Sequence, residues 1–454
     1  MDADPELRSL YTGISRSVRL ANNPGEFAHG GSLHDVAASS VAPLFTDFVN
    51  WVIQEARREG IKRLYFLSRD GQAFYRIAQE LVDPDDSLEL IYLEIARRAL
   101  FLPLLSSIDR KSIDEIVSGS DNRLTTLLQR LGFENCEEAY KLLKESGYAG
   151  PDLDGSPLST EEFQAFFDTL QQPKISKLVL QNADRNRQLF KRYAERKKLF
   201  AEGKFAKVDV GWCLNLQSMI RRLLTDLDPK IELHAYHLGI LDNRWNVSKA
   251  EYYRARYLQQ ESPQLESRNT RYLNKCTGVI EDFFCFADHG TVKEYVEREG
   301  EVWPVFNNST QDPKVESLRN QFNDSLQLYA REFRLWNLDR ISSDSFKSVA
   351  LENFIHFLKS PSGSEARAHI TINRDEVSDL PMATPVNFGH LFTILRAILK
   401  RQKPTPISTW GADSMAISIF PIRWAYSLAN ILKEYVRSSP SFRKLFLAYL
   451  RFRG

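Results

Sequence analysis

Two short segments carry the residue types that could hold a phosphorylated sugar. The first is Ser68-Arg69-Asp70-Gly71, which directly follows the apolar run at residues 63–67. The Arg69 guanidinium can hold a phosphate through two parallel hydrogen bonds, and the free amides that begin a following helix attract an anion. Asp70 could hold a metal ion or a sugar hydroxyl, and Gly71 allows close backbone approach. The alternative is that Ser68 or Asp70 only caps the helix.

The second segment runs from Val208 to Gln217 and has a comparable order of residue types. The carboxylate of Asp209 ends a strand-like run, Gly211 and Trp212 follow, and a helix then begins with polar side chains. Asp209 could bind ribose hydroxyls or Mg²⁺, while the amides of this turn and Asn215 could bind a phosphate. The alternative is a capped helix with Trp212 in the core. An aspartate at a strand end before Gly-Trp favours the ligand-binding interpretation.

Three further residues could reach the same site. Arg97 and Arg98 follow the predicted strand at 88–93, and the alternative for them is a solvated pair at a helix start. Glu281 precedes the aromatic pair Phe283-Phe284, so it is either a buried carboxylate with a paired charge or a catalytic role, or an exposed turn residue.

The composition excludes several classes of function. The chain has 454 residues, with 60 Lys and Arg against 59 Asp and Glu, so the net charge of +1 argues against nucleic-acid binding. Its four cysteines have no CxxC spacing, which makes a zinc site or a disulfide framework improbable and indicates a reducing compartment. The first residues lack the apolar core of a signal peptide, and no long uncharged apolar run is present. We expect a cytoplasmic protein with at most peripheral contact at the inner membrane surface, where the basic amphipathic segment 442–453 could contribute.

Hydrophobic patterns predict an α/β fold with a parallel sheet. Strands are expected at 63–67, 88–93, 205–210, 233–241 and 301–306, with Pro304 making the last an edge strand. Helices are expected around 41–56, with Gly60 as its C-cap, and at 122–133, 135–146, 159–170, 178–202, 315–337, 344–358, 387–402, 421–437 and 440–452. The expected domains are residues 1–104, holding N-terminal helices and half of the core, a helical insertion at 105–202, the second half of the core at 203–310, and a helical region at 311–454.

Five segments, in this order, resemble a bacterial family found beside or fused to glycosyltransferases of surface-polysaccharide gene clusters. They are Phe66 to Gly71, Tyr92 to Leu100, Val208 to Gln217, Glu281 to Phe284, and Pro361 to Ala366. Members of that family have been labelled predicted haloacid-dehalogenase (HAD-superfamily) hydrolases. The phosphatase module of fused members is not found in this chain, and Ser68 stands where such a phosphatase needs a nucleophilic aspartate. We therefore do not carry the hydrolase label over.

The region resembles the phosphoribosyltransferase module of ribofuranose-adding glycosyltransferase systems. The resemblance implies a parallel-sheet core similar to type I phosphoribosyltransferases, with residues 67–71 as the pyrophosphate loop and 208–217 as the loop that binds phosphoribosyl pyrophosphate (PRPP). Type I enzymes usually end the second strand with two adjacent acids, whereas Asp209 stands between Val208 and Val210. Leu214 occupies the position of a family glycine.

The resemblance also implies an activity, partners and residue roles. A 5-phosphoribosyl group would pass from PRPP to a glycan hydroxyl in O-antigen or capsule synthesis, in a pathway with other glycosyltransferases and a separate phosphatase that removes the 5-phosphate. Asp70, Asp209 and Glu281 would be catalytic, Asp70 and Asp209 would hold Mg²⁺, and either Asp70 or Glu281 would be the base. Substrate would be bound by Ser68, Arg69, Gly71, Gln72, Arg97, Arg98, Gly211, Trp212, Asn215 and Gln217. The alternatives are a HAD-like sugar-phosphate phosphatase and a non-catalytic scaffold of a polysaccharide-assembly complex.

Overall fold

The computed structural model describes residues 5–21, 30–117, 121–153, 155–228, 231–241, 252–259, 272–273, 276–285, 287–307, 313–338, 343–370 and 418. The chain divides into two units. The α/β unit comprises Phe48–Leu265 and Cys285–Thr310, and the helical unit comprises Met1–Asp47, Glu266–Phe284 and Gln311–Gly454. The helices expected at 387–402, 421–437 and 440–452, and the basic segment 442–453, lie outside the described residues.

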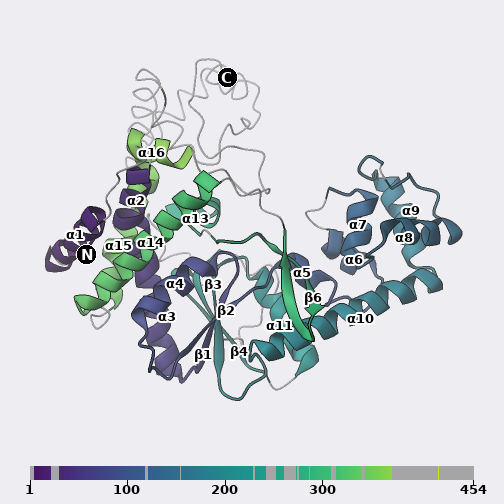
Figure 1. Ribbon diagram of the computed structural model, residues 1–454, viewed down its shortest axis with the longest axis horizontal. Helices are drawn as coiled ribbons and strands as arrows, with labels where there is room; N and C mark the ends of the chain where they lie inside the picture. Colours follow the sequence, from purple (N-terminus) through teal and green to yellow (C-terminus); the bar gives the residue numbers. More distant parts are fainter. Residues whose placement is uncertain are drawn as a thin grey trace, which may run out of the picture. The chain divides into compact units, whose positions relative to one another are not determined.

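A five-stranded parallel sheet forms the centre of the α/β unit (Figure 1). Its strands stand in the order β2-β1-β3-β4-β5. They are β1 (Arg63–Leu67), β2 (Glu89–Leu93), β3 (Phe205–Trp212), β4 (Leu233–Ile240) and β5 (Tyr253–Gln259). The predicted α/β class with a parallel sheet is therefore confirmed. The strand β5 was not predicted, because its sequence YRARYLQ carries two arginines in the run.

Aromatic side chains attach helices to the two faces of this sheet. On one face, α3 (Ala42–Glu59) and α4 (Gly71–Leu81) pack together through Phe48 and Phe74, whose ring centroids are 4.9 Å apart. Trp51 of α3 then meets Tyr236 of β4. On the other face, Phe205 and Leu233 of the sheet share a core cluster with α11 (Asn215–Leu227). The alternation of side chains along a strand makes this two-sided covering possible.

A helical insertion separates β2 from β3. It contains α5 (Arg97–Phe101), α6 (Arg110–Val117), α7 (Leu124–Arg130), α8 (Cys136–Glu145), α9 (Thr160–Leu170) and α10 (Pro173–Arg196). Figure 1 shows α6 to α9 gathered at one end of the long helix α10, around a core of their own that includes Leu128, Phe166 and Val179. The predicted helices of this region all form, although α10 begins earlier than expected because Pro173 is suited to a first helical position.

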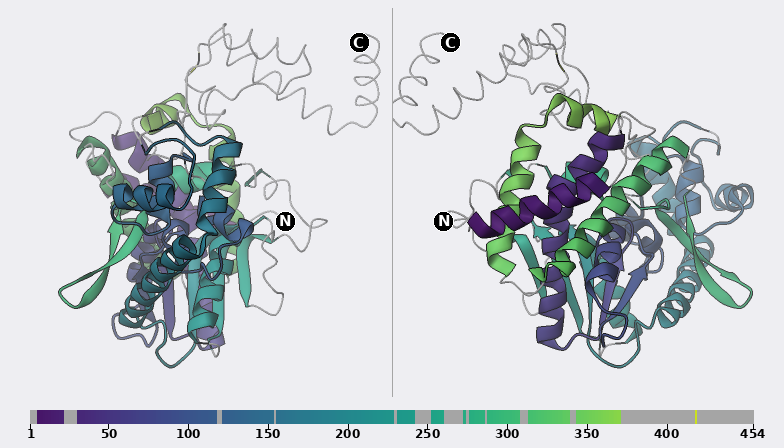
Figure 2. Two further views of the ribbon diagram at one scale, coloured as in Figure 1. Left: turned by 90° about the vertical axis from the view of Figure 1, so that its right-hand side faces the viewer. Right: turned by 60° about the vertical axis from the view of Figure 1, so that its left-hand side comes forward.

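A β-hairpin packs against the second half of α10 (Figure 2). Its antiparallel strands are β6 (Val292–Arg298) and β7 (Glu301–Phe306). Arg192 of α10 forms an ion pair with Glu297 at 2.6 Å, and the Arg196 guanidinium lies 3.8 Å from the ring centroid of Trp303. The strand expected at 301–306 forms, but it pairs with β6 in a separate hairpin and is not an edge of the parallel sheet.

The helical unit is described by itself. It contains α1 (Pro5–Ala21), α2 (Gly30–Val36), the π-helical segment η1 (Ala37–Val41), α13 (Thr277–Phe284), α14 (Pro313–Leu335), α15 (Ser343–Lys359) and α16 (Gly363–Ile370). The wider turn of η1 leaves the Ser39 carbonyl free to accept hydrogen bonds from the Tyr11 hydroxyl and the Asn353 amide. In the described part of the chain, one continuous helix, Leu33–Glu59, is long and apolar enough to span a membrane, and 89% of its most apolar window is buried.

Candidate functional site

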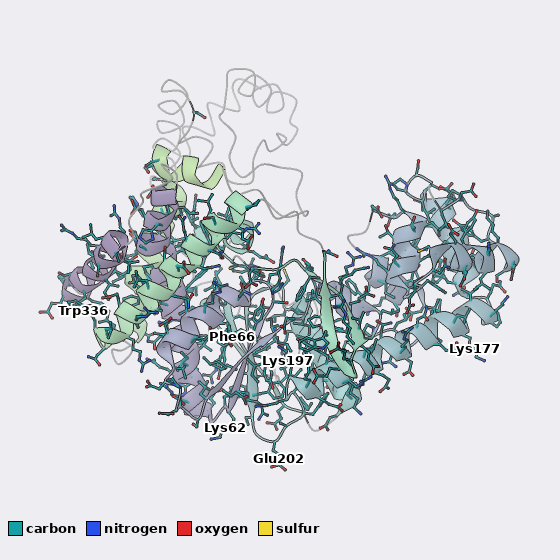
Figure 3. The ribbon with its side chains drawn as sticks, viewed as in Figure 1. Lys62, Phe66, Lys177, Lys197, Glu202 and Trp336 are labelled. Carbon is teal, nitrogen blue, oxygen red and sulfur yellow. The ribbon has the colours of Figure 1, made fainter. Side chains whose placement is uncertain are left out.

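The order of strands places the two predicted loops at one edge of the sheet. The chain leaves β1 toward β2 on one side, whereas β3 lies on the other side of β1. The boundary between β1 and β3 is therefore the topological switch point, and open parallel sheets bind ligands outside the carboxyl ends of strands at such a point. Phe66 pairs with Val208, so the residues that follow, Leu67 and Asp209, stand at one level. Figure 3 labels Lys62 before β1 and Phe66 near its carboxyl end.

Ser68 anchors the loop after β1 to the segment after β2. Its amide donates to the Leu93 carbonyl at 3.0 Å, and its hydroxyl both donates to the Ile95 carbonyl and accepts from the Ile95 amide at 2.9 Å. The Ser68–Arg69 peptide bond is cis. Asp70 stands at the N-cap position of α4 but makes no capping hydrogen bond. Neither side chain caps α4: the Ser68 hydroxyl bonds to Ile95, and Asp70 makes no capping hydrogen bond.

The first turn of α4 is hydrogen-bonded to Asp288, which lies in the second segment of the α/β unit, Cys285–Thr310. The Gln72 side-chain amide donates to Asp288 at 2.6 Å, and its carbonyl accepts from the Asp288 amide at 3.0 Å. Arg76 forms an ion pair with the same aspartate at 3.2 Å. The side chain of Gln72, which was predicted to bind substrate, is thus engaged with Asp288 in this structure. Glycine is favoured at position 71 because a Cβ would lie 3.0 Å from the Phe66 carbonyl carbon, closer than most such contacts.

Charged groups of this edge gather around Tyr92, at the end of β2. The Tyr92 hydroxyl lies 2.7 Å from His289 Nε2. Burial raises the pKa of Tyr92 strongly, and the negative charges of Asp288, Glu94 and Asp70 raise it further, while Arg69 lowers it. Arg69 and Asp70 therefore act electrostatically on the same tyrosine as Glu94 and Asp288.

The sequence analysis did not select Glu94, which directly follows β2. Its carboxylate lies 2.6 Å from the Lys197 ammonium and accepts a hydrogen bond from the Tyr193 hydroxyl at 2.6 Å. Burial would raise the pKa of Glu94, but these two partners hold it below its usual value. The available signal was its position at a strand end, the same signal that identified Asp209. Both of its partners come from α10, and only the fold could supply them.

The last residues of β3 hold Asp209 and lead into the turn before α11, so the strand continues two residues beyond the expected end at 210. Asp209 Oδ1 accepts a hydrogen bond from the Val210 amide at 2.9 Å. Gly211 then has φ of 103°, while Trp212 and Leu214 have φ of 60° and 54°. Leu214, which occupies the position of a glycine in the family that the sequence resembles, therefore adopts the left-handed backbone that glycine favours.

Buried polar groups follow in this turn and in the first turn of α11. The Gln217 side chain is fully buried, and neither of its amide atoms has a hydrogen-bond partner among the described residues. The Trp212 indole nitrogen is likewise buried without a partner in that part of the chain. Unpaired buried polar atoms are costly, so these two side chains have hydrogen-bonding capacity for a ligand or water. Asn215, the first residue of α11, is half-buried.

The remaining predicted residues fall in two places. Arg97 and Arg98 begin α5; Arg97 is exposed, and Arg98 lies 3.5 Å from the Asn307 side-chain oxygen. Glu281 lies half-buried on α13 of the helical unit, so it is not among the residues that the α/β unit brings together. A surface hollow along α10, lined by Pro173, Lys177 and Asp184 among others, involves none of the predicted residues.

The donor atoms at the sheet edge suit a magnesium ion that arrives with a diphosphate. No group of three or more His, Cys, Asp or Glu side chains gathers as a metal site in the described ranges. Mg²⁺ is usually held by one or two carboxylates together with substrate phosphates and water. Asp70, on the loop after β1, and Asp209, on β3, are the predicted ligands, and both carboxylates belong to the two strands that flank the switch point.

The chain matches no model of a known protein family, and a search of curated proteins finds no match. The function must therefore be argued from the site itself.

Proposed function

We propose that this protein transfers a 5-phosphoribosyl group from PRPP to a hydroxyl group of a glycan, with release of pyrophosphate. The observation that supports it is the position of the two predicted loops on both sides of the switch point between β1 and β3. A diphosphate and a 5-phosphate lie at opposite ends of PRPP. Two anion-binding loops at neighbouring strand ends match that distribution of charge.

Each loop is assigned one end of the donor. Arg69 and the backbone of residues 69–72 hold the pyrophosphate, with Mg²⁺ held by the carboxylates of Asp70 and Asp209. Asp209 also accepts hydrogen bonds from the ribose hydroxyls, and the amides of residues 211–217 bind the 5-phosphate. Gln217 and Trp212 supply buried donors whose hydrogen bonds within the described residues are unfilled. Arg97 and Arg98, at the start of α5, are assigned to the same substrate.

The transfer breaks the bond between ribose C1 and the pyrophosphate oxygen and forms a bond from C1 to the acceptor oxygen. The acceptor proton passes to a general base, for which Asp70 is the candidate within the α/β unit. Because positive charge develops on the ribose and negative charge on the leaving group, Arg69 and the loop amides lower the barrier by stabilising the departing pyrophosphate. A bound Mg²⁺ would neutralise further charge on that leaving group.

The rival activities make different predictions. A phosphatase of the haloacid-dehalogenase type needs an aspartate nucleophile, whereas the end of β1 presents Ser68 with its hydroxyl engaged by Ile95. It would release phosphate from an aryl phosphate without an acceptor. A non-catalytic scaffold would not bind PRPP, whereas an enzyme that binds PRPP with Mg²⁺ must be stabilised by it, which a thermal-shift titration measures.

The decisive experiment measures pyrophosphate release from PRPP and Mg²⁺ in the presence of a polysaccharide-repeat acceptor. Asp209→Ala is expected to lower the rate by about 100-fold or more, because it removes a group that contacts the reacting sugar. Asp226→Ala is the matched control, since Asp226 is an exposed aspartate near the far end of α11. An unchanged rate in Asp209→Ala would show that the site assignment is wrong, and absence of a PRPP-induced thermal shift would reject the activity.

A further inference from the structure

A lysine lies buried beneath the proposed ribose-binding residue. Lys207 precedes Asp209 by two positions on β3, so both side chains project from the same face of the sheet. The Lys207 side chain is only 2% exposed, and Asp209 is 14% exposed. Lysine is almost never fully buried without a partner, because removing an ammonium from water is expensive. A buried position on a central strand would ordinarily carry an apolar side chain, so the lysine at this position needs an explanation.

The position of its ammonium supplies that explanation. Lys207 Nζ lies 3.7 Å from Asp209 Oδ2, while Asp209 Oδ1 accepts from the Val210 amide at 2.9 Å. The two oxygens of the carboxylate are therefore held from different sides, one by an amide and one by a buried charge. Because the pair is removed from solvent, this attraction is screened much less than it would be on the surface.

A histidine completes the layer under the turn. His237 of β4 pairs in register with Asp209 and is fully buried. Burial and the charge of Lys207 hold the pKa of His237 well below its usual value, so the ring is neutral. It lies against the turn, since a Cβ at Gly211 would be 2.9 Å from His237 Nδ1. His237 therefore packs against the Gly211 backbone beside Asp209.

We propose that Lys207 is a positioning residue that acts through Asp209 and orients its carboxylate toward the ribose hydroxyls of the bound donor. This inference rests on the proposed function for the identity of the donor. The orientation of Asp209 itself is independent of the donor and can be tested separately. If Lys207 only filled space in the core, the effect of replacing it would not depend on the charge at position 209.

A double-mutant cycle measures that dependence. The affinity for PRPP with Mg²⁺ is determined by titration calorimetry for the wild type, Lys207→Met, Asp209→Asn and the double variant. Lys207→Met alone is expected to weaken binding by at least about tenfold, as for loss of one partner of a buried charge pair. In the Asp209→Asn background the same change should alter affinity by less than about threefold, because its partner charge is gone. An equal loss in both backgrounds would overturn the proposal.

Two further variants separate charge from bulk. Lys207→Arg keeps the positive charge and is expected to bind PRPP more tightly than Lys207→Met, and it provides the comparison with the wild type if Lys207→Met does not fold. Lys62→Met is the matched control, since Lys62 is exposed just before the amino end of β1 (Figure 3). It should bind PRPP as the wild type does. If Lys207→Arg lost as much affinity as a variant without charge, charge would not be the cause.

Crystal structures of the unliganded wild type, Lys207→Met and Lys207→Arg provide a readout that does not require PRPP. The Asp209 carboxylate is expected to leave the Val210 amide in Lys207→Met and to stay there in Lys207→Arg. An unchanged Asp209 side chain in Lys207→Met would overturn the positioning role, even if PRPP binds the wild type. If PRPP does not bind the wild type, the proposed function fails, and these structures still decide whether Lys207 orients Asp209.

Discussion

The residues of the candidate site show why glycine is needed at some positions and only tolerated at others. Gly211 combines φ of 103° with a crowded environment, because a Cβ there would lie 2.4 Å from the Gly239 carbonyl oxygen. Leu214 accepts a left-handed backbone nearby, and its side chain packs with Ile240. Backbone conformation alone therefore does not demand glycine in this turn, whereas close approach of a neighbouring strand does.

We predict that Gly211→Ala destabilises the protein by at least about 2 kcal/mol, because it adds both backbone strain and a steric overlap with a main chain that cannot move freely. The measurement is urea unfolding followed by circular dichroism. Gly60→Ala is the control, since Gly60 has φ of 68° at the end of α3 with nothing within 4 Å of a Cβ. It should cost only about 1 kcal/mol. Equal costs at the two positions would contradict the packing argument.

A second residue-scale prediction concerns His234, at the amino end of β4. The ring lies 3.6 Å from the Glu59 carboxylate and is nearly buried. Burial lowers the pKa of His234 below 6.5, although Glu59 opposes the shift. The unfolded chain therefore binds a proton more readily than the folded protein does. This contribution to stability is present above the unfolded pKa and is lost as the pH falls from about 6.5 toward the folded pKa.

The test follows the free energy of unfolding between pH 7.5 and pH 5.5. The wild type is expected to lose more stability over this range than His234→Gln, which cannot take up a proton. His356→Gln is the control, since His356 is exposed on α15 and should leave the profile as in the wild type. A steeper loss in His234→Gln would show that protonation of His234 favours the folded state.

At the scale of elements, the helical insertion depends on local signals that act without the sheet. Ser159 accepts from the Glu162 amide at 3.2 Å, and the Glu162 carboxylate accepts from the Ser159 amide at 2.8 Å. This capping box sets the start of α9, whose Phe163 and Phe166 then enter the core of the insertion. The four residues from Ser159 to Glu162 are therefore enough to predict where α9 begins.

We predict that Ser159→Ala destabilises the helix start by about 1 kcal/mol, because the Glu162 amide loses the Ser159 hydroxyl as its acceptor. Hydrogen exchange of the first-turn amides of α9 should speed up accordingly. Ser159→Asp retains a side-chain oxygen at the cap and should exchange at nearly the wild-type rate. Equal acceleration in both variants would show that the cap is not responsible.

At the scale of the whole molecule, the donor-binding residues and one candidate base belong to different units. Arg69, Asp70 and Asp209 lie in the α/β unit, and Glu281 lies in the helical unit. We predict that Glu281→Gln changes the affinity for PRPP by less than about twofold, since all proposed donor contacts come from the α/β unit. Titration calorimetry with PRPP and Mg²⁺ measures it. A loss beyond tenfold would place Glu281 in donor binding, and comparison of transfer rates with Asp70→Asn would identify the base.

The sequence by itself determined the class of fold and the two loops. Apolar runs of strand length predicted β1, β2, β3, β4 and β7 at nearly their observed bounds, because buried strands need continuous apolar residues. Gly60 was identified as the end of α3 from its residue type, and it has the expected positive φ. Residue types at strand ends also selected Asp70 and Asp209. These are local properties, and local properties can be read along a chain.

The tertiary structure decided which strands are neighbours and what surrounds each carboxylate. Placing β1 next to β3, across an insertion of more than a hundred residues, depends on packing between distant segments. Glu94 acquires Lys197, and Gln72 acquires Asp288, in the same way. Nor does spacing along β3 explain why Lys207 is buried, since that depends on the helices that cover its face. The partners of these polar groups are distant in the sequence and become neighbours only when the chain folds, so the pattern of residues along the chain does not identify them.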